Sequence, residues 1–179
     1  MRLKELYNSK AVPELMKEFE YKNVMQTPRL EKVVLAVGIS SKHKDTNLQS
    51  AVENTLLKIS GQKPVPRKAK KSISSFKIRE GNIVGMSVTL RKDRMYDFVD
   101  KLVNVTLPRV RDFRGISLKS FDGNGNYTIG FRDQVAFSEL TPADTDKLHG
   151  LEVVVVTTAK TDKEAKRLLE LLGFPFKKE

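Results

Sequence analysis

The sequence predicts an α+β fold in which helices pack on one face of a mostly antiparallel or mixed β-sheet. Segments with apolar residues at helical spacing alternate along the chain with short valine-rich segments. Residues 83–131 also contain glycine- and asparagine-rich turns of the hairpin type. The 179 residues, of which 39% are apolar and 31% charged, suit a single globular domain spanning 1–179. Such a sheet leaves its other face free to receive a ligand.

Four segments are predicted to be helical, namely residues 3–19, 45–61, 93–108 and 161–173. Pro13 suits the start of a second helix within the first segment better than its middle. Asp93 is expected to cap the third segment, and Pro108 to stop it. In the last segment, Thr161 and Glu164 have the spacing of a capping box.

Four segments are predicted to be strands, namely residues 31–37, 82–91, 127–131 and 151–160. The first is rich in valine and is bounded by Pro28 and Gly38. In the second, apolar residues recur in near alternation, as in a strand with one buried face. The four consecutive valines at residues 153–156 favour a strand that is buried on both faces.

The composition restricts the class of partner. The formal charge is +11 and the pI is about 9.8. A surplus of this size favours a polyanion, either nucleic acid or an anionic membrane. The longest strongly apolar run is the four valines, far short of a bilayer span, so no membrane partner is expected. The first ten residues have no apolar signal-peptide core, and a cytoplasmic protein is therefore expected.

No enzyme, cofactor or metal site is expected. The chain has no cysteine, which excludes thiolate chemistry and cysteine-based zinc sites. The histidines His43 and His149 lie far apart in the sequence, and the glycines of residues 123–130 do not have a nucleotide-binding spacing. One weak alternative is a metal-dependent RNA nuclease built on Asp93, Asp97 and Asp100, although these residues also suit a helix cap and a solvated face.

The densest basic segment is residues 61–81, which contain seven lysines and arginines against one acid. Its spacing is expected to put Lys68 and Lys70 on one face of an extended strand, with Lys71 on the opposite face. Isoleucine and phenylalanine lie among the charges and could pack on bases or ribose. These interleaved apolar residues favour nucleic-acid binding over a merely solvated basic loop.

A second basic cluster consists of Arg109, Arg111 and Arg114, with Asp112 between them. The rigid fork of an arginine suits phosphates and guanine edges. An ion pair of Asp112 with one of these arginines would explain the cluster equally well, by fixing a turn. Both interpretations stay open.

Five blocks of the sequence resemble one protein family. They are LLKISGQKPVPRKAKKSI, FKIREGNIVGMSVTLR, LPRVRDFRG, KSFDGNGNYTIGFRDQ and TTAKTDKEAKRLLELLGFPF. In this order they are similar to the uL5 family of bacterial large-subunit ribosomal proteins, which bind 5S ribosomal RNA in the central protuberance. The resemblance implies a non-enzymatic α+β protein of the cytoplasmic ribosome. Its implied partners are 5S rRNA, 23S rRNA, neighbouring large-subunit proteins, the P-site transfer RNA and a protein of the small-subunit head.

The resemblance also implies which residues make each contact. In similar proteins, the residues matching Gln62, Thr89 and Arg91 contact the 5S RNA. With the basic clusters added, the expected 5S-binding set is Gln62, Lys63, Lys68, Lys70, Lys71, Thr89, Arg91, Arg109, Arg111 and Arg114. Ala36 stands where family members usually carry an RNA-contacting asparagine, so that contact is missing or is supplied by another group.

Residues 72–81 are expected to be a mobile loop that reaches the transfer RNA and the small-subunit head. The residues expected to make this contact are Ser75, Phe76, Lys77, Ile78 and Arg79, with the last four at the tip. Such an excursion has few packing partners, so its order should depend on RNA. A basic RNA chaperone without a fixed site remains a second alternative.

Overall fold

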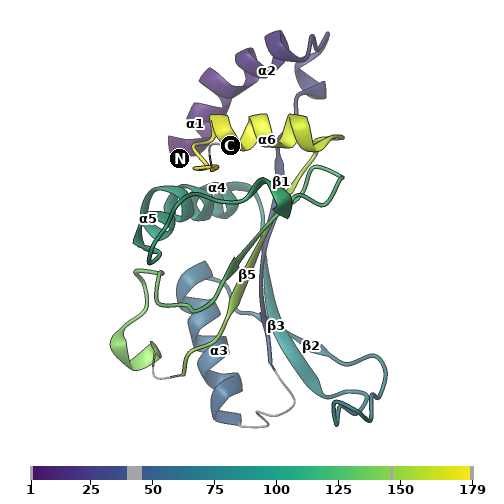
Figure 1. The fold of residues 1–179 in the computed structure, drawn as a ribbon, viewed down its shortest axis with the longest axis vertical. Coiled ribbons are helices and arrows are strands. Elements are labelled where there is room, and N and C mark those ends of the chain that lie inside the picture. The colour runs from purple at the N-terminus through teal and green to yellow at the C-terminus, as the bar shows by residue number, and fades with distance from the viewer. Residues whose placement is uncertain (1, 40–45, 146, 178–179) are drawn as a thin grey trace. The chain divides into compact units, whose positions relative to one another are not determined.

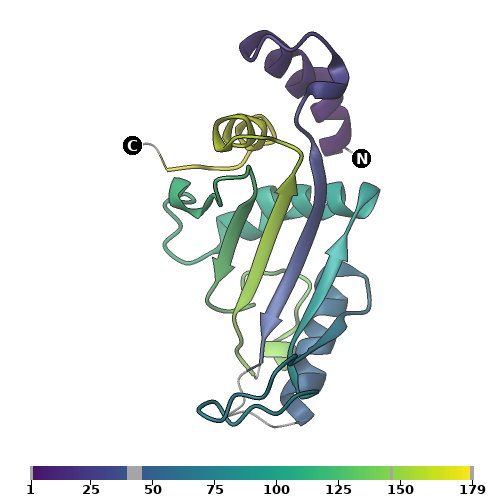
Figure 2. The ribbon, with the colours of Figure 1, turned by 90° about the vertical axis from the view of Figure 1, so that its right-hand side faces the viewer.

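The computed structural model describes residues 2–39, 46–145 and 147–177 (Figure 1). Five strands form one sheet in the order β2-β3-β1-β5-β4. They are β1 Leu30–Gly38, β2 Val65–Lys68, β3 Ile83–Leu90, β4 Tyr127–Phe131 and β5 Leu151–Thr157. β2 pairs antiparallel with β3, and β3, β1, β5 and β4 alternate in direction (Figure 2). The predicted α+β fold with an antiparallel sheet is therefore confirmed.

The residue contacts divide the chain into two compact units. Unit 1 contains Met1–Val33, Leu90–Ile129 and Val154–Glu179, and unit 2 contains Val34–Thr89 and Gly130–Val153. Strands β1, β3, β4 and β5 each have residues in both units. The single domain spanning 1–179 therefore stays a prediction.

Unit 1 contains two helical runs that each include a π-helical turn. In the first, α1 Arg2–Leu6 and the π turn Tyr7–Ala11 lead into α2 Val12–Glu18. In the second, α4 Lys92–Lys101 and the π turn Leu102–Thr106 lead into α5 Leu107–Arg109. Both runs therefore remain helical for longer than an α-helix interrupted by proline normally would.

A proline follows each π turn and explains it. The Val12 N–H donates to the Tyr7 carbonyl, one residue before Pro13, and the Leu107 N–H donates to the Leu102 carbonyl, one residue before Pro108. The wider turn relieves the clash between the proline ring and the carbonyl of the preceding turn. Pro13 thus begins α2 as predicted. Pro108 does not stop its helix, which continues to Arg109.

The start of α4 differs from the prediction. Arg91, in extended conformation, is its N-cap residue, and Asp93 lies in the first turn. The Asp93 carboxylate does not cap the helix, because it accepts a hydrogen bond from the Lys4 ammonium at 3.1 Å. Asp93 therefore links the first turn of α4 to α1 within unit 1.

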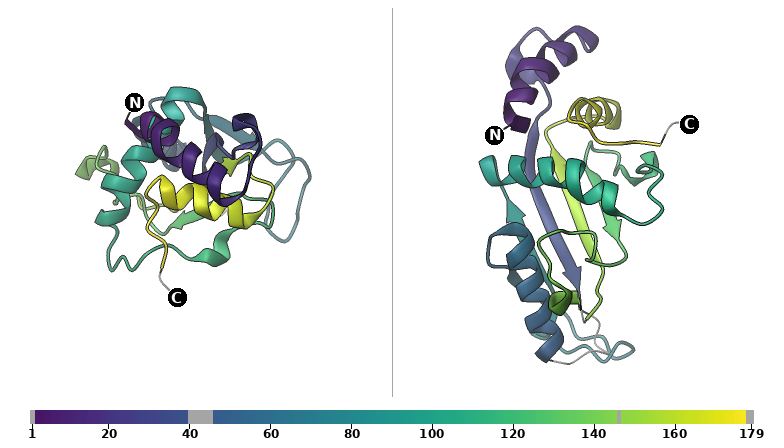
Figure 3. Two further views of the ribbon diagram at one scale, coloured as in Figure 1. Left: turned by 90° about the horizontal axis from the view of Figure 1, so that it is seen from above. Right: turned by 90° about the vertical axis from the view of Figure 1, so that its left-hand side faces the viewer.

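Helix α6, Asp162–Leu171, packs against α2 and the preceding π turn in unit 1 (Figure 3, left). Arg167 of α6 joins the two helices, since its Nε donates to Glu18 at 2.6 Å and its Nη2 lies 3.3 Å from Glu14. One half of the predicted capping box is present, since the Glu164 N–H donates to the Thr161 hydroxyl. The Glu164 carboxylate accepts from the Lys160 N–H rather than from that of Thr161.

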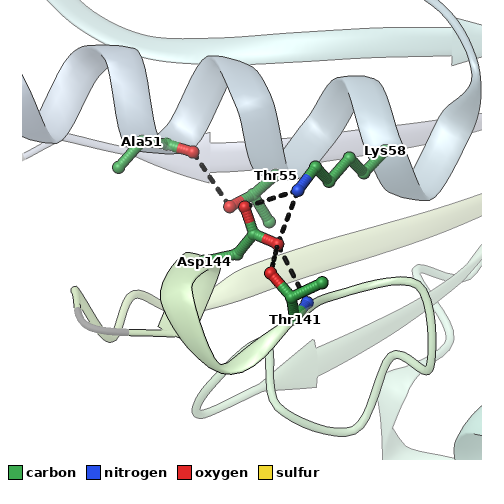
Figure 4. Close-up of polar contacts among 5 residues, drawn as sticks. All are labelled: Ala51, Thr55, Lys58, Thr141 and Asp144. Atoms are coloured by element: carbon green, nitrogen blue, oxygen red, sulfur yellow. Dashed lines mark hydrogen bonds and ion pairs between the residues drawn. The ribbon is translucent and has the colours of Figure 1, made fainter.

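Unit 2 contains α3, Thr46–Ser60, whose residues Val52, Leu56 and Ile59 are buried. The loop after β4 is joined to α3 by Asp144, whose two carboxylate oxygens each accept from the Lys58 ammonium at 2.7 Å (Figure 4). The N–H and hydroxyl of Thr141 also donate to Asp144. Hydrogen bonds from Lys58 and Thr141 lower the pKa of the Asp144 carboxyl to about 2.

Each unit has a helix on one face of its strands. In unit 2 this helix is α3, and in unit 1 it is α4 (Figure 2). In β5, Leu151, Val153 and Val155 are buried, whereas Val154 and Val156 are half-exposed. The prediction that β5 is buried on both faces is therefore wrong, because one face carries no helix.

None of the helices in the described part of the chain is both long and apolar enough to cross a bilayer.

Candidate nucleic-acid interface

The basic segment forms the edge of the sheet. β2 is the edge strand and pairs with β3, with Val65 opposite Ser87 and Arg67 opposite Gly85. The hairpin continues beyond β2, because Ala69 donates its N–H to the Asn82 carbonyl at 2.8 Å. The cations of this segment are therefore carried on a hydrogen-bonded hairpin instead of a floppy linker.

The far end of this hairpin, residues 72–81, is called the arm below. Ile73 and Ile78 pair with each other through two backbone hydrogen bonds of 2.9 and 3.1 Å. The turn between them consists of residues 74–77, and Lys77 has a φ of 52°. The Ser72 hydroxyl accepts from the Glu80 N–H at 2.9 Å. The arm is thus a small second hairpin on the end of the first.

The structure corrects which residues form the tip of the arm. Phe76 and Lys77 lie in the turn, as expected of tip residues, and Ser75, which was not expected at the tip, lies there too. Ile78 lies behind the turn, because it pairs with Ile73, and Arg79 follows it. Side-chain type alone could not have located the turn, since the paired isoleucines are separated by four residues of mixed character.

Most cations of the hairpin are exposed and lack an acidic partner. Lys63 lies 3.6 Å from the carboxylate of Glu53. Within the described chain, the other cations of the expected contact sets make no ion pair; these are Lys68, Lys70, Lys71, Lys77 and Arg79. Uncompensated positive charge on an ordered edge is the arrangement that phosphate binding requires.

The predicted strand alternation through Lys71 is wrong. β2 ends at Lys68, and the chain bends at Lys70 and Lys71. Pairing in the hairpin is irregular just before this point, between Arg67 and Lys68. An irregular pair increases local twist, so these lysines no longer point to alternate faces of a flat strand.

The three residues expected from the resemblance lie at the other end of the hairpin. In unit 2, the Gln62 amide reaches the Thr89 carbonyl at 3.5 Å, so these two residues are brought together. Arg91 lies in unit 1, directly after β3, and its backbone is extended with φ −138° and ψ 164°. Its guanidinium is 3.8 Å from Glu31 and more than half exposed. A distance of 3.8 Å leaves the guanidinium available to another anion.

Arg67 belongs to this surface but was not in the expected contact set. Its Nε donates to the Ser87 hydroxyl at 2.7 Å. Alternation along β3 puts Ser87 and Thr89 on the face opposite the buried Met86 and Val88, which is the uncovered face of unit 2. The register between β2 and β3 decides the face on which Arg67 lies, and a single sequence does not reveal that register.

Ala36 lies on the uncovered face of unit 2. In β1, Leu35 and Val37 are buried and Ala36 between them is half-exposed. Close to it, a Cβ on Gly85 would approach the Val37 carbonyl oxygen to 2.7 Å, so only glycine fits there. Gly85 on β3 therefore lies directly against the backbone of β1 at Val37 and Gly38.

The second basic cluster is exposed and lies in unit 1. Arg109 is the last residue of α5, Arg111 and Arg114 follow it, and Asp112 between them has a φ of 53°. Among the described residues, no arginine forms an ion pair with Asp112. The structure therefore gives no support to an ion pair as the reason for the cluster.

The nuclease alternative has no assembled site. Asp93 bonds to Lys4, and the Asp100 carboxylate accepts from the Asn104 amide at 2.6 Å. In the part of the chain that the structure describes, no three acidic or histidine side chains are grouped as metal ligands, and His43 lies outside that part.

The glycine-rich segment before β4 is a tight turn, as predicted. The Asp122 carboxylate accepts from the N–H groups of Asn124 and Asn126. The Gly125 N–H donates to Asp162 at 2.9 Å, and a Cβ on Gly125 would lie 2.9 Å from that of Ala159. These backbone donors are already used, so the turn is no phosphate cradle.

Comparison with known families decides the identity of the fold. The family model of "Ribosomal protein L5" matches residues 23–79, and the model of the C-terminus of the same ribosomal protein family matches residues 83–176. The chain belongs to the uL5 family. It is 55% identical, over 99% of both chains, to large ribosomal subunit protein uL5 of Caldanaerobacter subterraneus subsp. tengcongensis. It is 52% identical, over 98% of both, to that of Geotalea uraniireducens, and 55% identical, over 99% of this chain and 96% of the relative, to that of Fervidobacterium nodosum.

Membership confirms the family resemblance that the five sequence blocks indicate. uL5 is a family of structural ribosomal proteins, so the expectation that the chain is not an enzyme is confirmed as well. A bacterial ribosome is cytoplasmic, in agreement with the expected location. The gap between the two family models, residues 80–82, covers the last two residues of the arm and the residue before β3.

Proposed function

We propose that this uL5 chain is a structural subunit that binds 5S rRNA and attaches it to 23S rRNA and neighbouring proteins in the central protuberance. The arm contacts the P-site transfer RNA and the small-subunit head. One observation carries the proposal: the ordered edge hairpin presents exposed lysines and arginines that have no acidic partner among the described residues.

The two ends of the hairpin suit different roles. The sheet end contains Gln62, Thr89 and Arg67. The Gln62 amide donates to the Thr89 carbonyl, and the Arg67 Nε donates to the Ser87 hydroxyl. Fixed donors of this kind can bind phosphates in one register, and a fixed register is what a specific RNA site needs. The arm has its cations at a turn far along the hairpin from these residues, which suits a second, smaller contact.

Arg91→Ala is expected to weaken 5S rRNA binding on the order of tenfold, because an arginine in a specific RNA contact contributes about 1–3 kcal/mol. The double variant Lys77→Ala/Arg79→Ala should keep wild-type 5S affinity and lose the transfer-RNA or inter-subunit contact. Filter binding to purified 5S rRNA measures the first effect, and association of the two ribosomal subunits measures the second.

Lys166→Ala is the matched control, because it removes one cation from α6, a helix that contains none of the residues in the proposed contact sets. It should leave 5S affinity unchanged. Loss of 5S affinity in the arm double variant would contradict the proposed division of roles. Equal wild-type affinity for an unrelated structured RNA of the same length would contradict a specific site and favour an RNA chaperone.

A further inference from the structure

Two chemically labile dipeptides lie in the turn before β4. The sequence FDGNGNY, residues 121–127, contains the only Asn-Gly pair of the chain, Asn124–Gly125, and its only Asp-Gly pair, Asp122–Gly123. In such pairs the backbone nitrogen of the glycine can attack the side-chain carbonyl carbon of the residue before it, because glycine has no Cβ to hinder the approach. The side chains of Asp122 and Asn124 are exposed, so the attacked carbon of each is open to water.

The reaction at Asn124 is a deamidation. The Gly125 nitrogen forms a bond to the Cγ of Asn124 and loses its proton, and the side-chain nitrogen leaves as ammonia. Water then opens the resulting succinimide ring at either of its carbonyls, which leaves aspartate or isoaspartate in place of the asparagine. Isoaspartate lengthens the main chain by a methylene group and adds a negative charge to the turn.

The structure holds the attacking nitrogen in place. The Gly125 N–H donates to the Asp162 carboxylate at 2.9 Å, and the Thr157 hydroxyl donates to the Gly125 carbonyl at 2.7 Å. Gly125 is buried, and a Cβ on it would lie 2.9 Å from the Cβ of Ala159. To reach the Cγ of Asn124, the Gly125 nitrogen must turn away from Asp162 and lose its proton. The hydrogen bond to the carboxylate opposes both changes.

Asp122 is restrained in a different way. One of its carboxylate oxygens accepts from the N–H groups of Asn124 and Asn126, at 2.8 and 3.0 Å, and the other accepts from the Asn126 side-chain amide at 2.7 Å. The hydrogen bond from the Asn126 side chain, followed by those from the backbone, lowers the pKa of the Asp122 carboxyl below its ordinary value. An ionised carboxylate is a poor electrophile, so Asn124 is the more reactive of the two residues.

We propose that Asn124 is a deamidation site that the folded chain protects through the Gly125–Asp162 hydrogen bond. Asp162 is the first residue of α6, so the site becomes reactive when the first turn of that helix opens. All of these residues lie in unit 1. Deamidation at Asn124 therefore marks chains that have been unfolded or partly open. The inference does not depend on RNA binding, so its test is independent of the proposed function.

The test measures isoaspartate at residue 124 by mass spectrometry of proteolytic peptides, after incubation of the full chain in mildly alkaline buffer. Folded wild type is compared with wild type unfolded in urea and with folded Asp162→Ala. Unfolding should speed deamidation at Asn124 by at least about tenfold. Asp162→Ala should speed it on the order of tenfold in the folded chain, because loss of a hydrogen bond to a carboxylate shifts a local opening equilibrium by about that factor.

Glu164→Ala is the matched control. Glu164 is the other acid in the first turn of α6, but its carboxylate accepts from the Lys160 N–H and not from Gly125. This variant should deamidate at Asn124 at the wild-type rate. Hydrogen exchange of wild type tests the same contact without any substitution, since the Gly125 N–H should exchange with solvent more slowly than the N–H of the exposed Gly123.

Three results would overturn the proposal. Equal deamidation rates in folded and unfolded wild type would show that the fold does not protect Asn124. An unchanged rate in folded Asp162→Ala, or an equal increase in Glu164→Ala, would show that the Asp162 carboxylate is not the protecting group. Exchange at Gly125 as fast as at Gly123 would contradict the hydrogen bond itself, and this measurement decides the question if Asp162→Ala does not fold.

Discussion

At the scale of single residues, the Lys58–Asp144 contact could not be predicted from the sequence. The two residues are 86 positions apart, and no local pattern links them. In contrast, Gln62 and Thr89 were assigned to one surface because the family resemblance implies it, and the structure brings the two residues together. Arg67 was not assigned, because its face depends on the register between two strands.

The same contact predicts a pH effect on stability. Asp144 has a pKa of about 2 in the folded chain, below its ordinary value of 3.8. Its contribution to stability is therefore present above about pH 4 and is lost as the pH falls from about 4 to about 2. Asp144→Asn should be less stable than wild type at neutral pH, and the difference should shrink across this range.

Urea denaturation at several pH values from about 7 down to about 2.5 measures the effect. Lys58→Met is the partner variant, and it should remove most of the effect of Asp144→Asn when the two are combined. A stability difference between wild type and Asp144→Asn that stays constant with pH would show that the carboxylate charge is not involved.

At the scale of elements, periodicity predicted four of the five strands and most of the helices, because apolar spacing reports directly on burial. Periodicity failed where the structure depends on factors other than the spacing of apolar residues. The π turns before Pro13 and Pro108 keep the helices continuous, which spacing cannot reveal. The four valines of β5 suggested two buried faces, but the helices that would cover the second face are absent from the described chain.

The arm is predicted to open easily without RNA. It has paired backbone bonds between Ile73 and Ile78, yet Ile73 is 44% exposed and Phe76 is 63% exposed, so little apolar area holds it closed. The amides of Ile73 and Ile78 should exchange with solvent much faster than that of Val88 in β3, and should become protected when ribosomes assemble.

Hydrogen exchange measured by NMR tests this expectation, with two variants as controls. Ser72→Ala removes the bond to the Glu80 N–H and should speed exchange further. Lys77→Gly relieves a φ of 52° and should slow it. Exchange at Ile73 as slow as at Val88 in the free chain would mean that the arm is rigid before it meets RNA.

At the scale of the whole molecule, the surplus of positive charge and the fold together explain the proposed role. A formal charge of +11 by itself indicates a polyanionic partner. The fold adds an edge hairpin on which exposed cations stand without acidic partners among the described residues. The class of ligand was predictable from charge, whereas the arrangement of the cations depends on the strand order and register.

The most direct test is the salt dependence of 5S rRNA binding by wild type and by the triple variant Lys68→Ala/Lys70→Ala/Lys71→Ala. Each phosphate contact contributes about 0.7–0.9 to the slope of log affinity against log salt concentration. We expect a steep slope for wild type and a slope lower by about 2 for the triple variant. A flat wild-type slope, or an identical slope for the two proteins, would contradict binding through the hairpin phosphate contacts.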